Sequence, residues 1–323
     1  MTQLELSKPM GQRIVTEDEI ATFARLTGDD ARIHLDSEFA RANGLPGPIA
    51  QGLLGASWAL GALTQNAPER MGVGEPDAWL SGFSVRFTRR VVAGDTLSFR
   101  WRDGPPIDQP SAVSKSLITV VEIANQREEV VSSGEVTLSI GPKPDELSQS
   151  PARWLVEPPS PIQERMGPPA VYFAEDVLEY GPRGEAGVRS VSEADVVSFA
   201  EHTGELNPLY LNAGFAEGTQ CGSRIVPPML TFCSGFATFL HELLTIPMPS
   251  AGFAGHLGDT WQCYRPVSFG DSLQVAHQPL SCARTRSRPE MAVVRFGLQV
   301  INQDDVVVQD GEVNMMIPGR PRR

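Results

Sequence analysis

The strongest constraint on the fold of this chain is an internal repeat. Its second half repeats the first at an offset of 176 positions, as between Gly28 and Gly204. The ungapped matches are Thr27 and Gly28 with Thr203 and Gly204, Phe39 and Ala40 with Phe215 and Ala216, Ile49 with Ile225, Arg89 with Arg265, Val91 with Val267, Gly94 and Asp95 with Gly270 and Asp271, and Leu97 with Leu273. After one inserted residue the match resumes, with Asn125 and Gln126 on Asn302 and Gln303. The duplication therefore spans nearly the whole chain.

The repeat predicts two tandem domains. A length of 323 residues suits two domains, each large enough to bury its own core. We place the first domain at 1–140 and the second at 171–323. The segment 141–170 between them is rich in proline, serine and glycine, which is typical of a linker.

Composition describes a compact globular protein and excludes several partners. Apolar residues make up 41% of the chain, charged residues make up 20%, and the formal net charge is −12. This acidity argues against non-specific binding to nucleic acid or to an anionic membrane surface, so an anionic ligand must find local arginines. Residues 1–10 lack the pattern of an export signal, and we expect a cytoplasmic protein. The apolar stretches 49–63 and 225–248 are expected to be buried core helices rather than membrane spans.

Each copy shows the same order of expected elements. A capping pattern, Thr16 with Glu19 and Ser192 with Asp195, opens a short amphipathic helix in each half, and the apolar helix follows. The β-rich runs that come next are 79–87, 96–101, 117–123 and 130–140, with counterparts at 259–267, 272–276, 292–300 and 306–317. These patterns predict an α+β fold in which a curved antiparallel sheet wraps one long buried helix per copy.

The residues that carry chemistry lie on a loop of the first copy. Asp29 and His34 follow Gly28, and on a loop the carboxylate and the imidazole can converge on one water molecule. The amide of Gly52 lies where the apolar helix is expected to begin, so it can donate a hydrogen bond to a developing oxyanion with help from the helix dipole. A base, a water-binding group and an oxyanion donor are thus all present.

This loop, the Phe39-Ala40 step and the helix start around 49–52 resemble the MaoC-like, or (R)-specific, enoyl-CoA hydratases of the hot-dog superfamily. The resemblance covers both halves and implies a double hot-dog fold and reversible addition of water to an α,β-unsaturated acyl thioester. It also implies that Asp29 and His34 are the catalytic pair and that Gly52 supplies the oxyanion amide. Gln51 stands where the family often has histidine, and its side chain still offers a hydrogen bond to substrate.

The second copy departs from that pattern at each reactive position. Glu205 replaces the aspartate, Tyr210 replaces the histidine, and Pro228 replaces the glycine whose amide is needed. We therefore expect a single active site, in the first copy. The second copy would then be structural and supply a pocket for the acyl group, with Met229 and Phe232 of its apolar helix as substrate-binding residues.

We expect the following roles for the residues of the first copy. Asp29 is the principal base on the water, and His34 holds the water and helps deliver a proton to the α-carbon. Arg86, Arg89 and Arg90 follow a strand and either meet the phosphates of a carrier or form a solvated strand end. Neither a metal nor a redox cofactor is required.

The substrate is expected to be a thioester of coenzyme A or of acyl carrier protein. A mesaconyl-type hydratase of branched or dicarboxylic acyl groups is the alternative within this class. A hot-dog thioesterase and a non-catalytic acyl-thioester-binding protein are the alternatives outside it. Whether two such chains associate as a homodimer stays open.

Overall fold

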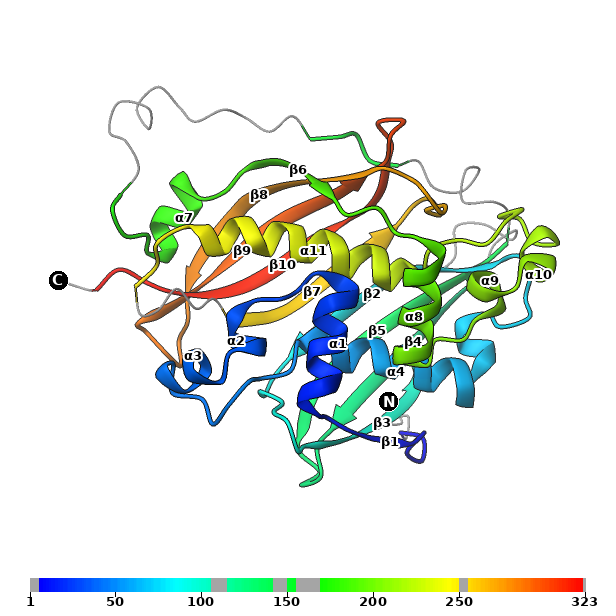
Figure 1. Cartoon of the computed structure of the whole chain (residues 1–323), viewed down its shortest axis with the longest axis horizontal. Coiled ribbons are helices and arrows are strands. Elements are labelled where there is room, and N and C mark those ends of the chain that lie inside the picture. Colours follow the sequence, from blue (N-terminus) through cyan, green and yellow to red (C-terminus); the bar gives the residue numbers. More distant parts are fainter. Residues whose placement is uncertain (1–5, 106–114, 142–149, 155–168, 250–254, 322–323) are drawn as a thin grey trace.

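The computed structural model describes residues 6–105, 115–141, 150–154, 169–249 and 255–321. Its strands form one antiparallel sheet in the order β1-β3-β4-β5-β2-β7-β10-β9-β8-β6 (Figure 1). The strands are β1 (Gln12–Ile14), β2 (Ala78–Phe87), β3 (Thr96–Asp103), β4 (Lys115–Ala124), β5 (Val130–Ile140), β6 (Gly184–Val188), β7 (Gly255–Cys263), β8 (Leu273–Arg284), β9 (Met291–Ile301) and β10 (Val307–Pro318). The order reads as two copies of one sheet joined at β2 and β7.

The two copies meet about a local twofold axis at the centre of the sheet. Ser84 of β2 pairs with Thr260 of β7, and these two residues are equivalent positions of the repeat. Hydrogen bonds outside the sheet follow the same symmetry. The guanidinium of Arg13 donates to the carbonyl oxygen of His202 at 2.7 Å, and that of Arg189, its counterpart, donates to the carbonyl oxygen of Leu26 at 2.9 Å. The duplicated chain is thus packed as a covalent pseudo-dimer.

The helices have the same duplicated arrangement. They are α1 (Glu17–Thr27), α2 (Arg32–Leu35), α3 (Ser37–Ala42), α4 (Gly52–Asn66) and the 3₁₀ helix η1 (Pro68–Met71), then α7 (Ala174–Tyr180), α8 (Glu193–Thr203), α9 (Pro208–Leu211), α10 (Ala213–Glu217) and α11 (Pro228–Thr245). The hydroxyls of Thr16 and Ser192 cap α1 and α8, as the sequence predicts. Gly28 and Gly204 end these helices at φ of 87° and 83°, a left-handed conformation that glycine adopts without strain.

Each long helix packs on the strands of its own copy. Helix α4 contacts β3, β4 and β5, whereas α11 contacts β6, β8 and β9 (Figure 1). The copies also approach each other closely through these helices, because a Cβ at Gly61 of α4 would lie 2.0 Å from the carbonyl oxygen of Thr203 at the end of α8. The predicted double hot-dog fold is confirmed.

Two strand predictions for the second copy need correction. Strand β7 covers Gly255–Cys263 instead of 259–267, and β8 extends to Arg284 instead of ending at 276. The apolar Val267 made the first boundary misleading, because it is buried in the core from a loop and accepts a hydrogen bond from the amide of Val226. A buried loop residue therefore gave the sequence the apolar pattern of a strand at this boundary.

Most of the predicted linker, 142–149 and 155–168, lies outside the described residues, and the domain boundaries stay a prediction. The described segment 150–154 packs on the second copy, where the amide of Trp154 donates to the Gln299 side chain at 2.9 Å. Within the described ranges, no helix combines the length and the apolar character that a membrane crossing requires.

Candidate active site

The end of α1 positions the predicted acid-base pair. The left-handed turn at Gly28 directs the chain away from the helix, and one turn later α2 presents His34. The side chains of Asp29 and His34 are 6% and 11% exposed, and His34 Nε2 lies 3.8 Å from Asp29 Oδ1. The structure thus brings together the two residues that the sequence singled out.

The hydrogen bonding of His34 sets its tautomer. Its Nδ1 lies 2.7 Å from the carbonyl oxygen of Ile49, and a carbonyl can only accept. Nδ1 therefore carries a proton, and in the neutral ring Nε2 is the acceptor that faces Asp29. Since Nε2 and Oδ1 are 3.8 Å apart, one water oxygen can lie about 2.8 Å from both and donate a hydrogen bond to each.

Gln51 holds the backbone that carries Asp29. Its side-chain Nε2 donates to the carbonyl oxygens of Asp29 at 3.1 Å and Ile20 at 3.3 Å. The side chain is buried at the cavity wall, and its Oε1 has no hydrogen-bond partner among the described residues. Gln51, predicted to bind substrate, is therefore first a positioning residue for the loop, and only Oε1 is left for a ligand.

Gly52 is the first residue of α4, where an amide has no acceptor within its own helix. A Cβ at this position would lie 2.7 Å from two ring carbons of Phe87, so the ring packs directly on the glycine. Both residues line the same cavity as Asp29 and His34. The start of α4 therefore presents a backbone donor to the cavity. With Phe87 in its present place, only glycine fits at position 52.

The cavity has a volume of about 1030 Å³, and both copies contribute to its lining. Helix α11 supplies Phe236, Leu240 and Leu244, and the second copy also supplies residues from β7, β10 and the turn after β8. Six arginines lie around this cavity, namely Arg32, Arg86, Arg89, Arg90, Arg127 and Arg288. The three predicted arginines are all among them, and in a chain of net charge −12 they form a local positive region.

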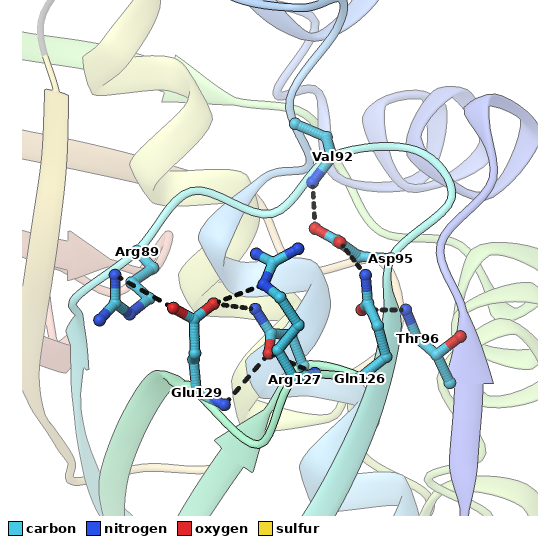
Figure 2. Close-up of polar contacts among 8 residues, drawn as sticks. Arg89, Val92, Asp95, Thr96, Gln126, Arg127 and Glu129 are labelled. Carbon is cyan, nitrogen blue, oxygen red and sulfur yellow. Dashed lines mark hydrogen bonds and ion pairs between the residues drawn. The ribbon is translucent and has the colours of Figure 1, made fainter.

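Sequence reasoning missed Arg127 and Arg288, which come from turns between strands. Figure 2 shows how the first of these is held: the Glu129 carboxylate lies 2.9 Å from Arg127 Nε and 3.7 Å from Arg89. Hydrogen bonds from Asn125 and Arg127 hold the pKa of Glu129 below its usual value. Because Arg127 and Arg89 are far apart in the sequence, only the strand pairing could reveal that they share one carboxylate.

The neighbouring loops are tied together by Asp95, which accepts hydrogen bonds from the amide of Val92 and the side chain of Gln126 (Figure 2). The repeat preserves this network, because Asp271 accepts in the same way from Ser268 and Gln303. The shared aspartates and glutamines of the two copies therefore stabilise loops, whereas Arg127 and Glu129 belong to the first copy.

Met229 and Phe232, predicted to bind substrate, do not line this cavity. Both are at most 1% exposed, and Phe232 packs against Trp261 and Phe83 with ring centroids 4.3 and 4.9 Å away. The wall is formed instead by Phe236 and residues further along α11. The sequence could not identify the face of α11 that meets the cavity, because almost the whole circumference of this helix is apolar.

The equivalent space in the second copy is nearly filled. A void of about 10 Å³ remains between Tyr210, Pro228, Thr231 and their neighbours. Glu205 is fully buried, and burial raises its pKa to about 8 even though Tyr210 acts in the opposite direction. Glu205 is thus neutral at pH 7, and Pro228 has no amide hydrogen to donate.

Comparisons with known proteins agree with this duplicated architecture. Residues 5–120 match the MaoC like domain, and residues 181–311 match the FAS1-like, dehydratase domain region. A 3-hydroxybutyryl-CoA dehydratase of Methylorubrum extorquens is 32% identical over 148 residues, which cover 46% of this chain and 85% of that protein. An (R)-specific enoyl-CoA hydratase of Rhodospirillum rubrum is 26% identical over 150 residues, covering 46% of this chain and 94% of that protein.

Solved structures share the fold over the whole chain. A putative MaoC domain protein dehydratase from Chloroflexus aurantiacus superposes with a TM-score of 0.74 at 15% identity, covering 99% of this chain and 97% of that one. A conserved hypothetical protein from Mycobacterium tuberculosis, described as having a double hotdog fold, superposes with a TM-score of 0.65 at 17% identity, covering 98% and 96%. The chain therefore belongs to the MaoC-like hydratase and dehydratase family.

Proposed function

We propose that the first copy adds water to a trans-2-enoyl thioester, or removes it from a 3-hydroxyacyl thioester, with Asp29, His34 and Gly52 as the catalytic groups. One observation carries the proposal. Asp29 Oδ1 and His34 Nε2 lie 3.8 Å apart in the same cavity as the start of α4. A water held by the first two groups is then close to a thioester whose carbonyl oxygen accepts from the Gly52 amide.

The proposed reaction follows from these positions. Asp29 accepts a proton as the water oxygen bonds to the β-carbon, and the double-bond electrons move towards the thioester oxygen. The Gly52 amide stabilises the negative charge that develops there. A proton then returns to the α-carbon, with His34 assisting its delivery, so that one water has been added across the double bond. Dehydration is the same sequence reversed.

The carrier of the acyl group is proposed from charge. The six arginines around the cavity suit the phosphates of coenzyme A or of a carrier-protein prosthetic group, and the names of the two relatives refer to CoA esters. Helix α11 provides an apolar wall for the acyl chain. We propose in the same way that 1–140 is the catalytic domain and that 171–323 is a structural domain that helps shape the pocket.

The experiment is a panel of trans-2-enoyl-CoA thioesters, followed by loss of the conjugated thioester absorbance and by the stereochemistry of the product. Hydration by the wild type, and its loss in Asp29→Asn, are the expected results. Release of free thiol would instead identify a thioesterase, and binding without turnover would identify a non-catalytic acyl-thioester-binding protein.

A further inference from the structure

A second histidine and aspartate pair lies at the same cavity, contributed by the other copy: His256 lines the cavity, and Asp259 is fully buried beside it. His256 and Asp259 are three residues apart on β7, so in a regular strand their side chains would point to opposite faces. A β-bulge changes this, because Asn314 pairs with Gly258 while the next residue, Met315, pairs with His256. Because Leu257 is skipped in this pairing, the side chains of His256 and Asp259 both point to the inner face of the sheet.

The pair is closely fixed. His256 Nε2 lies 2.8 Å from Asp259 Oδ1, and the carboxylate is fully buried. The imidazole ring stacks on Phe236 at a centroid distance of 4.4 Å and meets the edge of Phe87 at 4.9 Å. Since Phe87 in turn packs on Gly52, His256 is separated from the proposed oxyanion site by one aromatic ring.

The repeat provides an internal comparison for this pair. The equivalent residues of the first copy are Leu80 and Phe83, and β2 has its own bulge between Leu80 and Gly82. Leu80 lines the void of about 10 Å³, whereas His256 lines the cavity of about 1030 Å³. The backbone geometry is therefore shared, but the polar pair is present only where the cavity is open.

The environment of the pair leaves one ring nitrogen of His256 for a ligand. Burial raises the pKa of the Asp259 carboxyl, and the neighbouring His256 acts in the opposite direction. Asp259 binds Nε2, and Nδ1 makes no hydrogen bond to a described residue. The His256 side chain is 15% exposed, so Nδ1 is the ring nitrogen that meets a ligand in the cavity, and it donates when it carries a hydrogen.

We propose that His256 is a specificity-determining residue that binds a carboxylate on the acyl group of the substrate, with Asp259 as its positioning residue. This inference rests on the proposed acyl-thioester substrate and narrows it. The acyl group would carry its carboxylate at the end away from the thioester, next to Phe87 and Phe236. A plain hydrocarbon chain of the same length would leave His256 without a partner at this part of the wall and would bind less tightly.

Binding of two saturated thioesters tests this without requiring catalysis. Succinyl-CoA and butyryl-CoA carry four-carbon acyl groups and differ by a carboxylate in place of a methyl group. Titration calorimetry on the full chain should show succinyl-CoA binding roughly tenfold to a hundredfold tighter, the range of a hydrogen bond to a charged group. Equal affinities, or tighter binding of butyryl-CoA, would overturn the proposal.

Variants assign the preference to the pair. His256→Leu introduces the residue of the other copy and should abolish the preference by weakening succinyl-CoA binding alone. Asp259→Asn should reduce the preference for succinyl-CoA, because the imidazole ring of His256 is then no longer held in place. Leu244→Ala, on the same cavity wall, is the control and should affect both ligands alike.

If His256→Leu, shown to be folded by circular dichroism, keeps the wild-type preference, another group binds the carboxylate and the proposal is wrong. If it does not fold, Asp259→Asn and the wild-type affinity ratio decide instead. Absence of enoyl hydration with the succinyl preference intact would contradict the proposed reaction alone. Hydration without a preference would contradict this inference alone.

Discussion

The two copies of the repeat share a backbone plan but differ a hundredfold in the space that they enclose next to the long helix. The first copy has a cavity of about 1030 Å³ at the start of α4, and the second has about 10 Å³ at the start of α11. Gly52, Gly55 and His34 line the first space, and their counterparts Pro228, Thr231 and Tyr210 line the second. Side chains in place of two glycines, and a larger ring, fill the second site.

The second copy lines the cavity of the first copy, although its own equivalent space is nearly filled. Its helix and its strand β7 supply Phe236 and His256 to the cavity of the first copy. The central β2 and β7 pairing makes this possible, because it places each strand next to the site of the other copy. The cavity at the start of α4 is thus built from both copies.

The largest effect is expected from removal of the acid-base pair. Asp29→Asn and His34→Ala should each lower kcat for enoyl hydration by about 10²- to 10⁴-fold, the usual contribution of a positioned acid or base. The measurement is the initial rate of absorbance loss, with thermal unfolding to show that the fold is intact. Near-normal turnover in either variant would contradict the assignment.

The next largest effect concerns Gly52, and the contact with Phe87 changes what its substitution should do. Gly52→Ala keeps the amide but places a methyl group against the ring, so it should impair turnover by itself. Adding Phe87→Leu should restore part of the activity. Gly52→Pro with Phe87→Leu should stay about 10²- to 10³-fold below the wild type, because the donor is gone.

A comparison of kcat among these double variants separates the two causes. If alanine and proline at position 52 behave alike when Phe87 is reduced to leucine, backbone strain is responsible and the amide has no role in stabilising the oxyanion.

A smaller effect should distinguish two phenylalanines of α11. Phe236→Ala enlarges the cavity and should alter kcat/KM between short and long acyl groups by about tenfold, as a few methylene contacts in an apolar pocket do. Phe232→Ala removes a core contact and should instead lower the free energy of unfolding by about 3–5 kcal/mol. Urea unfolding and kinetics on three acyl lengths measure both quantities. The assignment fails if Phe232→Ala changes the acyl preference more than Phe236→Ala does.

The smallest effect on turnover is expected in the second copy. Glu205→Gln and Tyr210→Phe should leave kcat/KM within about twofold of the wild type, as expected for positions remote from the reacting atoms. A tenfold loss in either variant, with folding intact, would show that the second copy takes part in the chemistry.

Glu205 should nevertheless affect how stability varies with pH. Its pKa is about 8 in the folded state against 4.5 for an unperturbed glutamate, so the folded state favours the protonated form. The stability associated with this neutral form is fully present below about pH 4.5 and is lost as the pH rises through about 8, by up to about 5 kcal/mol. In Glu205→Gln this dependence should disappear from unfolding curves recorded between pH 5 and pH 8.5.

The sequence predicted the features that depend on local pattern and on the repeat. The caps at Thr16 and Ser192 and the loop with Asp29 and His34 have short-range signals, and the structure contains them. The lack of an amide donor at the start of α11 could also be predicted, because proline at position 228 has no amide hydrogen whatever the tertiary structure.

Features that depend on packing could not be predicted. The face of α11 that meets the cavity has no sequence signal, so Met229 and Phe232 were chosen where Phe236 and Leu240 form the wall. His256 and Asp259 were missed because a spacing of three residues indicates a common face only if a bulge intervenes. The contact of Phe87 with Gly52 likewise arises from tertiary packing.

The number of ligands bound per chain distinguishes one open site from two. Saturated thioesters such as succinyl-CoA and butyryl-CoA have no double bond to hydrate, so titration calorimetry with them on the wild type measures stoichiometry without turnover. One ligand per duplicated chain is predicted, because the second site has room for no more than a water molecule. Two equivalent ligands per chain would contradict the assignment of one site to the chain, since both copies would then hold an open site.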